Sequence, residues 1–142
     1  MSYSIDLVEA DQGGGLYRTH LRMGGISVCS APQSVKETYC DLKANLILLS
    51  TRRLKSMFFG NRPLVSLDLD ADILTASVFT VTDLGRRKLV DRQDLRVVSA
   101  YLNGFADALE VFLKASSENV EELKAEVQRD LSTGVYDVYL NE

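Results

Sequence analysis

Hydrophobic and polar side chains alternate along the first 30 residues of the chain. Within residues 3–9, Tyr3, Ile5 and Leu7 alternate with Ser4 and Asp6, and residues 16–23 alternate again. A period of two is typical of strands that bury one face. The glycine-rich segments 13–15 and 24–25 favour turns. This pattern predicts a first group of three strands, the third at residues 26–29.

Apolar residues then recur at helical spacing in two long segments. In the first, Ser34 and Glu37 form the pattern of a capping box, and Gly60 predicts the end of the helix. In the second, Asp91 or Asp94 is the expected cap. Successive apolar residues are four, three, four and three positions apart in both, which places them on one helix face: Val35, Tyr39, Leu42, Leu46 and Leu49, then Val98, Leu102, Phe105, Leu109 and Phe112.

The rest of the chain predicts further strands and a third helix. Residues 64–69, 73–82 and 88–90 are rich in β-branched and apolar residues and read as strands. Residues 118–132 carry an apolar stripe at helical spacing among many carboxylates, and residues 135–140 alternate as a last strand would.

The expected fold is α+β, in the order β-β-β-α-β-β-β-α-α-β. Connections of hairpin length favour a mainly antiparallel sheet, with the two long helices packed on one face and a shorter acidic C-terminal helix. The length of 142 residues predicts a single domain, 1–142. A shift of 63 residues superposes the two helical stripes, so residues 1–60 and 61–116 form a possible pseudo-repeat of strands plus helix.

The net charge of −4 is unevenly distributed. Residues 97–142 hold three Lys or Arg and nine Asp or Glu, whereas residues 1–96 hold a small excess of basic residues. The start of the chain has neither a basic nor an apolar leader segment, and the longest strongly apolar run, residues 46–49, is far too short to span a bilayer. We therefore expect a cytoplasmic protein that does not enter a membrane.

The two cysteines, Cys29 and Cys40, do not form a CxxC motif. In a cytosolic chain, such cysteines are usually reduced and buried. No histidine or basic residue is close to them in the sequence to activate a thiol. We expect two buried, unreactive thiols.

His20 is the single histidine and the natural candidate for a general base, flanked by Arg18 and Arg22. These three residues could form a small active or ligand site, or they could be the solvent side of a strand. No nucleophile-elbow motif accompanies them. An enzyme or ligand-binding domain around His20 is therefore the third hypothesis.

No metal-binding or phosphate-binding motif is complete in the sequence. The Asp68-x-Asp70-x-Asp72 segment resembles the start of a calcium loop, but Ile73 and Phe79 occupy the positions where such a loop needs glycine and glutamate. The triple glycine lacks the Lys-Ser/Thr pair and the helix that a phosphate loop needs. We expect no metal site, no cofactor and no catalytic residue.

Two basic clusters, within residues 52–62 and 86–88, could contact the phosphates of a nucleic acid. Overall acidity opposes this role because affinity for nucleic acids comes mainly from phosphate neutralisation. A nucleic-acid-binding accessory protein is therefore the second hypothesis.

The leading hypothesis is a non-enzymatic protein-binding module, such as an adaptor, a chaperone-like accessory protein or an inhibitor of another macromolecule. We expect a homodimer that associates through the helix at 94–115 or a sheet edge. Charged faces on a loop tip and on the acidic helix are the expected contacts with another protein, namely Arg86, Arg87, Lys88, Glu118, Glu122 and Glu126. No stretch of the chain carries a motif specific enough to name a family.

Overall fold

The structure is a computed structural model that describes residues 3–10, 14–23, 26–51, 53–54, 56–59, 62–70, 75–81 and 86–140. The predicted turns at 24–25, 71–72 and 83–85, and the predicted helix end at Gly60, lie outside these residues. No helix in the described ranges is long and apolar enough to cross a membrane.

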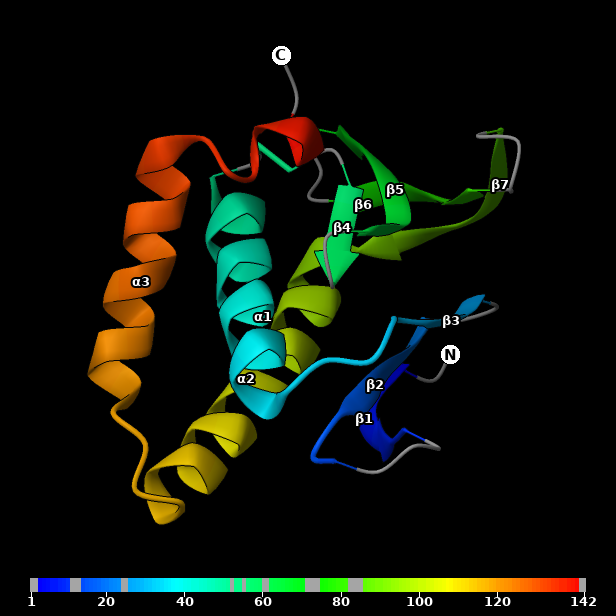
Figure 1. The fold of residues 1–142 in the computed structure, drawn as a ribbon. Helices are drawn as coiled ribbons and strands as arrows, with labels where there is room; N and C mark the ends of the chain where they lie inside the picture. The colour runs from blue at the N-terminus through cyan, green and yellow to red at the C-terminus, as the bar shows by residue number, and fades with distance from the viewer. Residues whose placement is uncertain are drawn as a thin grey trace.

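The expected α+β class and antiparallel strand pairing are confirmed, but the described strands form two sheets rather than one (Figure 1). The first sheet has the order β1-β2-β3 and the second the order β4-β5-β6-β7. Pairing is antiparallel throughout both. The strands are β1 (Tyr3–Glu9), β2 (Tyr17–Met23), β3 (Ile26–Cys29), β4 (Ser56–Phe59), β5 (Arg62–Asp70), β6 (Thr75–Val81) and β7 (Arg87–Asp94).

Strand β4 was not expected, and it corrects the predicted strand order. The first helix, α1 (Val35–Ser50), ends ten residues before Gly60, and the backbone N–H of Thr51 bonds back to Ile47. All four residues of β4 are buried. In a strand that is buried on both faces, apolar and polar residues do not alternate. The apolar residues of β4 therefore looked in the sequence like a continuation of the apolar stripe of the first helix.

Helix α1 lies at the centre of the helical part of the molecule. It packs against α2 (Leu95–Ala115), α3 (Val120–Thr133) and β4, while α2 also contacts β1 and β7 (Figure 1). The two long helices therefore do not share one face of a single sheet. Most residues of the predicted stripes are buried: Tyr39, Leu42, Leu46, Leu49, Val98, Leu102 and Leu109.

Two polar groups connect these elements. The buried Asn45 of α1 accepts a hydrogen bond from the backbone N of Phe58 at 3.1 Å and donates to its carbonyl O at 2.7 Å. Glu110 of α2 accepts hydrogen bonds from Tyr39 Oη and from Lys124 Nζ. Lys114, then Tyr39 and Lys124, hold the pKa of Glu110 below its usual value. One carboxylate thus ties three helices together.

The C-terminal segment is not the predicted strand. Gly134 takes a left-handed conformation with φ of 81°, and a short 3-10 helix, η1 (Asp137–Tyr139), follows. The rings of Tyr136 and Tyr139 stack on Phe58 with centroid distances of 4.9 and 4.3 Å. These aromatic contacts fix the end of the chain against β4, with only an isolated bridge between Leu54 and Leu140.

Candidate functional site

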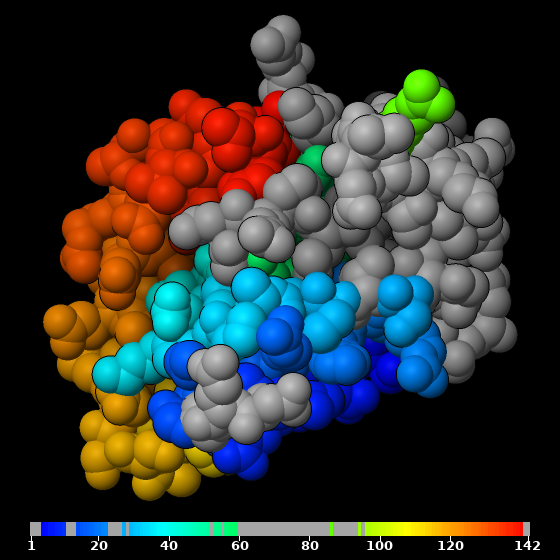
Figure 2. All heavy atoms as spheres, turned by 45° about the vertical axis from the view of Figure 1, so that its right-hand side comes forward, coloured from blue at the N-terminus to red at the C-terminus, as the bar shows by residue number. Residues whose placement is uncertain are grey.

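A polar pocket of about 500 Å³ lies between α1 and α3. Its walls are the segment 31–34 before α1, the first two turns of α1, one side of α3 and the turn at 135–136. Figure 2 shows the N-terminal strands (blue), the start of α1 (cyan) and α3 (orange) on one face of the molecule. The volume is in the range of ordinary ligand pockets.

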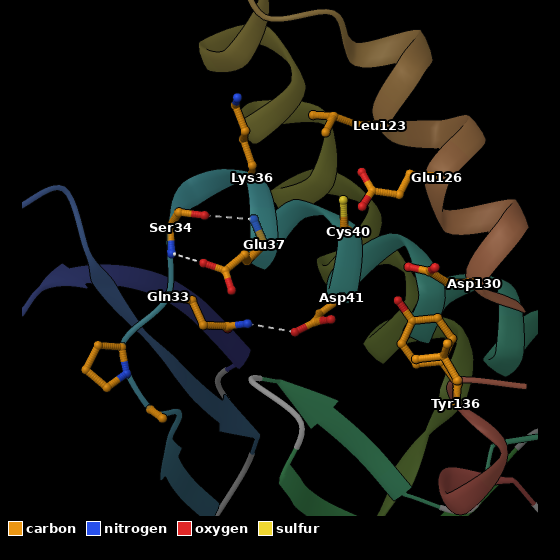
Figure 3. A pocket seen from close by; sticks show the side chains of 13 residues that line it. Gln33, Ser34, Lys36, Glu37, Cys40, Asp41, Leu123, Glu126, Asp130 and Tyr136 are labelled. Carbon is orange, nitrogen blue, oxygen red and sulfur yellow. Dashed lines mark hydrogen bonds between the residues drawn. The ribbon is translucent and has the colours of Figure 1, made fainter.

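The capping box fixes the α1 side of the pocket. Ser34 Oγ accepts a hydrogen bond from the backbone N of Glu37, and Glu37 Oε1 accepts one from the backbone N of Ser34, each at 3.1 Å (Figure 3). Positions 37, 40 and 41 lie on one side of a helix because they are three and four residues apart. The predicted capping box therefore positions Glu37, Cys40 and Asp41 at the pocket wall.

Carboxylates dominate the charge of this pocket. Glu37 and Asp41 of α1 line it together with Glu126 and Asp130 of α3. In Figure 3 the carboxylates of Glu37 and Asp41 point towards the segment before α1, where they accept hydrogen bonds from Ser34 and Gln33. Among the described residues that line it, Lys36 is the one basic residue, and its Nζ is 2.9 Å from Glu118 Oε2. The pocket therefore carries an excess of negative charge.

Gln33, in the segment before α1, also lines the pocket and is only 4% exposed (Figure 3). Its backbone O accepts a hydrogen bond from the backbone N of Tyr17 of β2 at 2.7 Å, and its backbone N donates to the backbone O of Tyr17 at 2.8 Å. Its Nε2 donates to Asp41 Oδ2 at 2.7 Å, whereas its Oε1 has no hydrogen-bond partner among the described residues. A buried acceptor without a donor is costly, and a donor supplied by a ligand would remove this cost.

Two weakly acidic groups of the pocket stay neutral. Burial raises the pKa of the Cys40 thiol to about 12, and Glu126 and Asp41 add to the shift. Burial, followed by the charges of Asp41 and Asp130, also raises the pKa of Tyr136. Cys40 is therefore a poor nucleophile, and the carboxylates supply the negative charge of the pocket.

The pocket suits an organic cation better than a metal ion. Within the described part of the chain, no three His, Cys, Asp or Glu side chains are grouped closely enough to hold a metal ion. Carboxylates spread over two helices match the dispersed N–H donors of a guanidinium group more closely than they match a single point charge.

The residues predicted to bind a partner are divided between two regions. Glu126 lines the pocket, Glu118 pairs with Lys36 at its rim, and Glu122 is exposed on α3. Arg86 is exposed just before β7, and Arg87 and Lys88 are the first residues of that strand. Strand β7 and helix α3 are on opposite sides of the molecule in Figure 1. The side chains of Arg87 and Lys88, like Arg52 and Lys55 of the other basic cluster, lie outside the described residues.

The structure corrects the expectation that both thiols are buried and have no histidine nearby. Cys29 is exposed, and its Sγ is 3.3 Å from His20 Nε2. The cause is strand register, because His20 pairs with Cys29 of β3 on one side and with Asp6 of β1 on the other. Residues nine positions apart thus become neighbours, which local sequence context could not reveal.

Sequence reasoning identified Glu126 and the capping box but did not find the pocket. Gln33, Asp41 and Tyr136 converge only after α3 packs against α1. The available signal was the coincidence of carboxylates on the first turns of α1 and on α3. The chain matches no protein-family model, and neither the curated proteins nor the solved structures contain a significant match.

Proposed function

We propose that this chain is a protein-binding module and that the pocket between α1 and α3 binds a basic side chain of its partner. The observation that carries the proposal is that Glu37 and Asp41 of α1 and Glu126 and Asp130 of α3 line one pocket, which Gln33 with its buried, unpaired Oε1 also lines. Arginine is the best match, because its five N–H donors can reach several separate acceptors.

The proposal narrows the leading hypothesis to a partner segment that is basic and exposed. Such a segment belongs to another cytoplasmic protein, and the module acts as an adaptor, a chaperone-like accessory protein or an inhibitor. The acidic row formed by Glu118, Glu122 and Glu126 would steer the segment towards the pocket. The cluster of Arg86, Arg87 and Lys88 stays a second predicted contact, for a separate part of the partner.

A fluorescently labelled arginine-rich peptide tests this function. We expect binding that weakens as salt concentration rises and that falls at least about tenfold in the double variant Glu126→Gln, Asp130→Asn. Anisotropy titrations at two ionic strengths measure both effects. An acidic peptide of the same length should not bind.

The matched control is Glu9→Gln with Asp6→Asn, which removes the same charge from exposed positions on β1. This variant should bind the basic peptide almost as wild type does. Equal losses in the two double variants would mean that net charge alone attracts the peptide, and the pocket would then not be the binding site.

A second candidate function is thiol chemistry at Cys29, which the 3.3 Å contact with His20 favours. It is the concrete form of the third hypothesis, an enzyme or ligand-binding domain around His20. A histidine beside a thiol can accept its proton and so produce the reactive thiolate. Binding of a nucleic acid, the second hypothesis, is supported only by the two basic clusters within residues 52–62 and 86–88.

A further inference from the structure

Helix α2 is apolar over more of its circumference than its contacts with the rest of the chain cover. Its inner face carries buried residues such as Val98, Leu102 and Leu109. A second row follows at helical spacing around the outside of the helix. This row, here called the outer face, consists of Val97, Tyr101, Gly104, Ala108, Val111 and Phe112.

Large apolar groups of the outer face are exposed to solvent. The exposed fractions are 54% for Phe112 and 69% for Val111, with 46% for Tyr101 and 37% for Val97. The sequence placed Phe112 in the buried stripe, but Leu113 takes that place and is 2% exposed. A step of three residues from Leu109 leads to Phe112 and a step of four leads to Leu113. Both steps are compatible with one helix face, so spacing alone could not decide which residue is buried.

The middle of the outer face is hollow. An apolar groove of about 530 Å³ runs between β1 and α2, and small residues of the helix, Ala100, Gly104 and Ala108, form one wall. A Cβ atom added at Gly104 would have no atom within 4 Å. The described part of the chain therefore gives no packing reason for glycine here, although glycine costs about 1 kcal/mol relative to alanine inside a helix.

We propose that a second copy of this chain occupies the groove, with the two α2 helices antiparallel and crossing at Gly104. Small residues at the crossing point allow two helix backbones to approach closely, while larger groups on either side fill the space. A two-fold axis at Gly104 places Ala100 of each copy opposite Ala108 of the other. Phe112 and Val111 of one copy then cover the N-terminal half of the other helix, near Val97.

The charge pattern favours the antiparallel direction. Arg96, Asp107 and Lys114 lie along one border of the outer face. A parallel pair would set each of these charges beside its own copy and would align the helix dipoles unfavourably. The antiparallel pair instead sets residues 94–96 of one copy opposite residues 112–114 of the other. This places Asp94 opposite Lys114, so the Asp94–Arg96 ion pair lies beside the Glu110–Lys114 ion pair of the second copy.

The available area fits a dimer of modest stability. Tyr101 and Phe112 each expose about half of a side chain whose full burial removes 150–250 Å² from water. With the valines and small residues, two copies would bury on the order of 1,000 Å², the lower limit for a specific interface. We therefore expect a dissociation constant in the range of about 1–100 μM.

Sedimentation equilibrium of Gly104→Lys tests the interface without endangering the fold. Lysine is a better helix former than glycine, and its Cβ meets nothing within 4 Å, so the monomer should stay folded. Its side chain would occupy the crossing point, and we expect dimer affinity to fall at least about tenfold. Asn103→Lys adds the same charge one residue away on the exposed polar side and should leave the dimer intact.

Disulfide trapping tests the direction of the helices. Ala100→Cys and Ala108→Cys are made separately in a chain that carries Cys29→Ser. Mixing the two variants should give a rapid cross-link between them, because positions 100 and 108 face each other in the antiparallel pair. Each variant alone should cross-link poorly, because its two copies would be about 12 Å apart along the helix axis.

Three results would overturn the proposal. One is a wild-type chain that stays monomeric at about 200 μM, well above the expected dissociation constant. Another is a Gly104→Lys variant that dimerises as well as Asn103→Lys, which would move the interface to another surface such as the edge strand β1. The third is rapid cross-linking within Ala100→Cys alone, which would show a parallel pair.

Discussion

Cys29 and Cys40 are both free thiols, but their surroundings differ. Cys40 is partly buried among carboxylates that help raise its pKa to about 12, whereas Cys29 is exposed beside His20. Only the thiolate reacts with alkylating reagents, and almost none of Cys40 is ionised near neutral pH. Their reactivity should therefore differ strongly.

Iodoacetamide should modify Cys29 at least about 100-fold faster than Cys40 at pH 7.5. Mass spectrometry of peptides from the folded protein measures both rates. Cys29→Ser should abolish the fast reaction, and His20→Asn, which removes the imidazole 3.3 Å from the Cys29 Sγ, should slow it. Fast modification of Cys40 would contradict the burial and the surrounding negative charge that the structure gives it.

Residue-level expectations from the sequence succeed where local pattern determines burial. Tyr39, Leu42 and Leu102 are almost fully buried, as their spacing predicted. Cys29 and Phe112 were assigned wrongly for a shared physical reason. Each environment depends on a second element, the neighbouring strand for Cys29 and the direction of packing for Phe112, and spacing along one element does not contain that information.

At the level of elements, two helix-associated glycines make a matched test of backbone conformation. Gly104 lies inside α2 with space for a side chain, whereas Gly134 ends α3 with φ of 81°, and a Cβ there would be 2.8 Å from Asp137 Oδ2. Gly104→Ala should stabilise the monomer by about 0.5–1 kcal/mol. Gly134→Ala should destabilise it by about 1 kcal/mol or more.

Urea unfolding at low protein concentration, where dimers do not contribute, measures both changes. The two substitutions add the same methyl group, so the difference in sign isolates backbone conformation and local space. Equal stabilisation by both would contradict the left-handed conformation at Gly134. A loss of stability in Gly104→Ala would mean that α2 is packed more tightly than the structure indicates.

The bounds of the helices were easier to predict than those of the strands. The capping box at Ser34 and the bounds of the helices expected at 94–115 and 118–132 were close to those observed, because side-chain chemistry at helix ends is local. Strand β4 was missed because a short, fully buried apolar segment has no alternation. The last six residues alternated as a strand does, but Tyr136 and Tyr139 instead stack on Phe58.

At the scale of the whole molecule, the sequence predicted the α+β class but not the division into two sheets. Strand count and hairpin spacing are properties of neighbouring segments, whereas the pairing of strands that are distant in the chain decides whether two groups of strands form one sheet or two. The acidic pocket was unpredictable for the same reason, since it requires α3 to fold back on α1. The uneven charge was visible in the sequence and indicated which half of the chain carries the acidic surface.

Reversing charges on the two predicted contact regions tests that whole-molecule arrangement. One triple variant carries Glu118→Lys, Glu122→Lys and Glu126→Lys, and the other carries Arg86→Glu, Arg87→Glu and Lys88→Glu. Both should remain folded, because charges on the surface contribute little to stability and Arg86, Glu122 and Glu126 are exposed. Glu118 is the most sensitive position, since its reversal would set two ammonium groups together at Lys36, although solvent screens this repulsion.

Binding should separate the two variants. The reversed acidic row should lose affinity for a basic peptide by at least about tenfold, with a slower association rate and a weaker dependence on salt. The reversed basic cluster should bind that peptide as well as wild type or slightly better, because β7 and α3 are far apart in Figure 1 and the added negative charge attracts the peptide only at long range. If the basic-cluster variant instead lost affinity while the acidic-row variant kept it, recognition would lie at the start of β7. If neither variant changed, an apolar surface would have to carry the recognition, and the outer face of α2 would be the first surface to test.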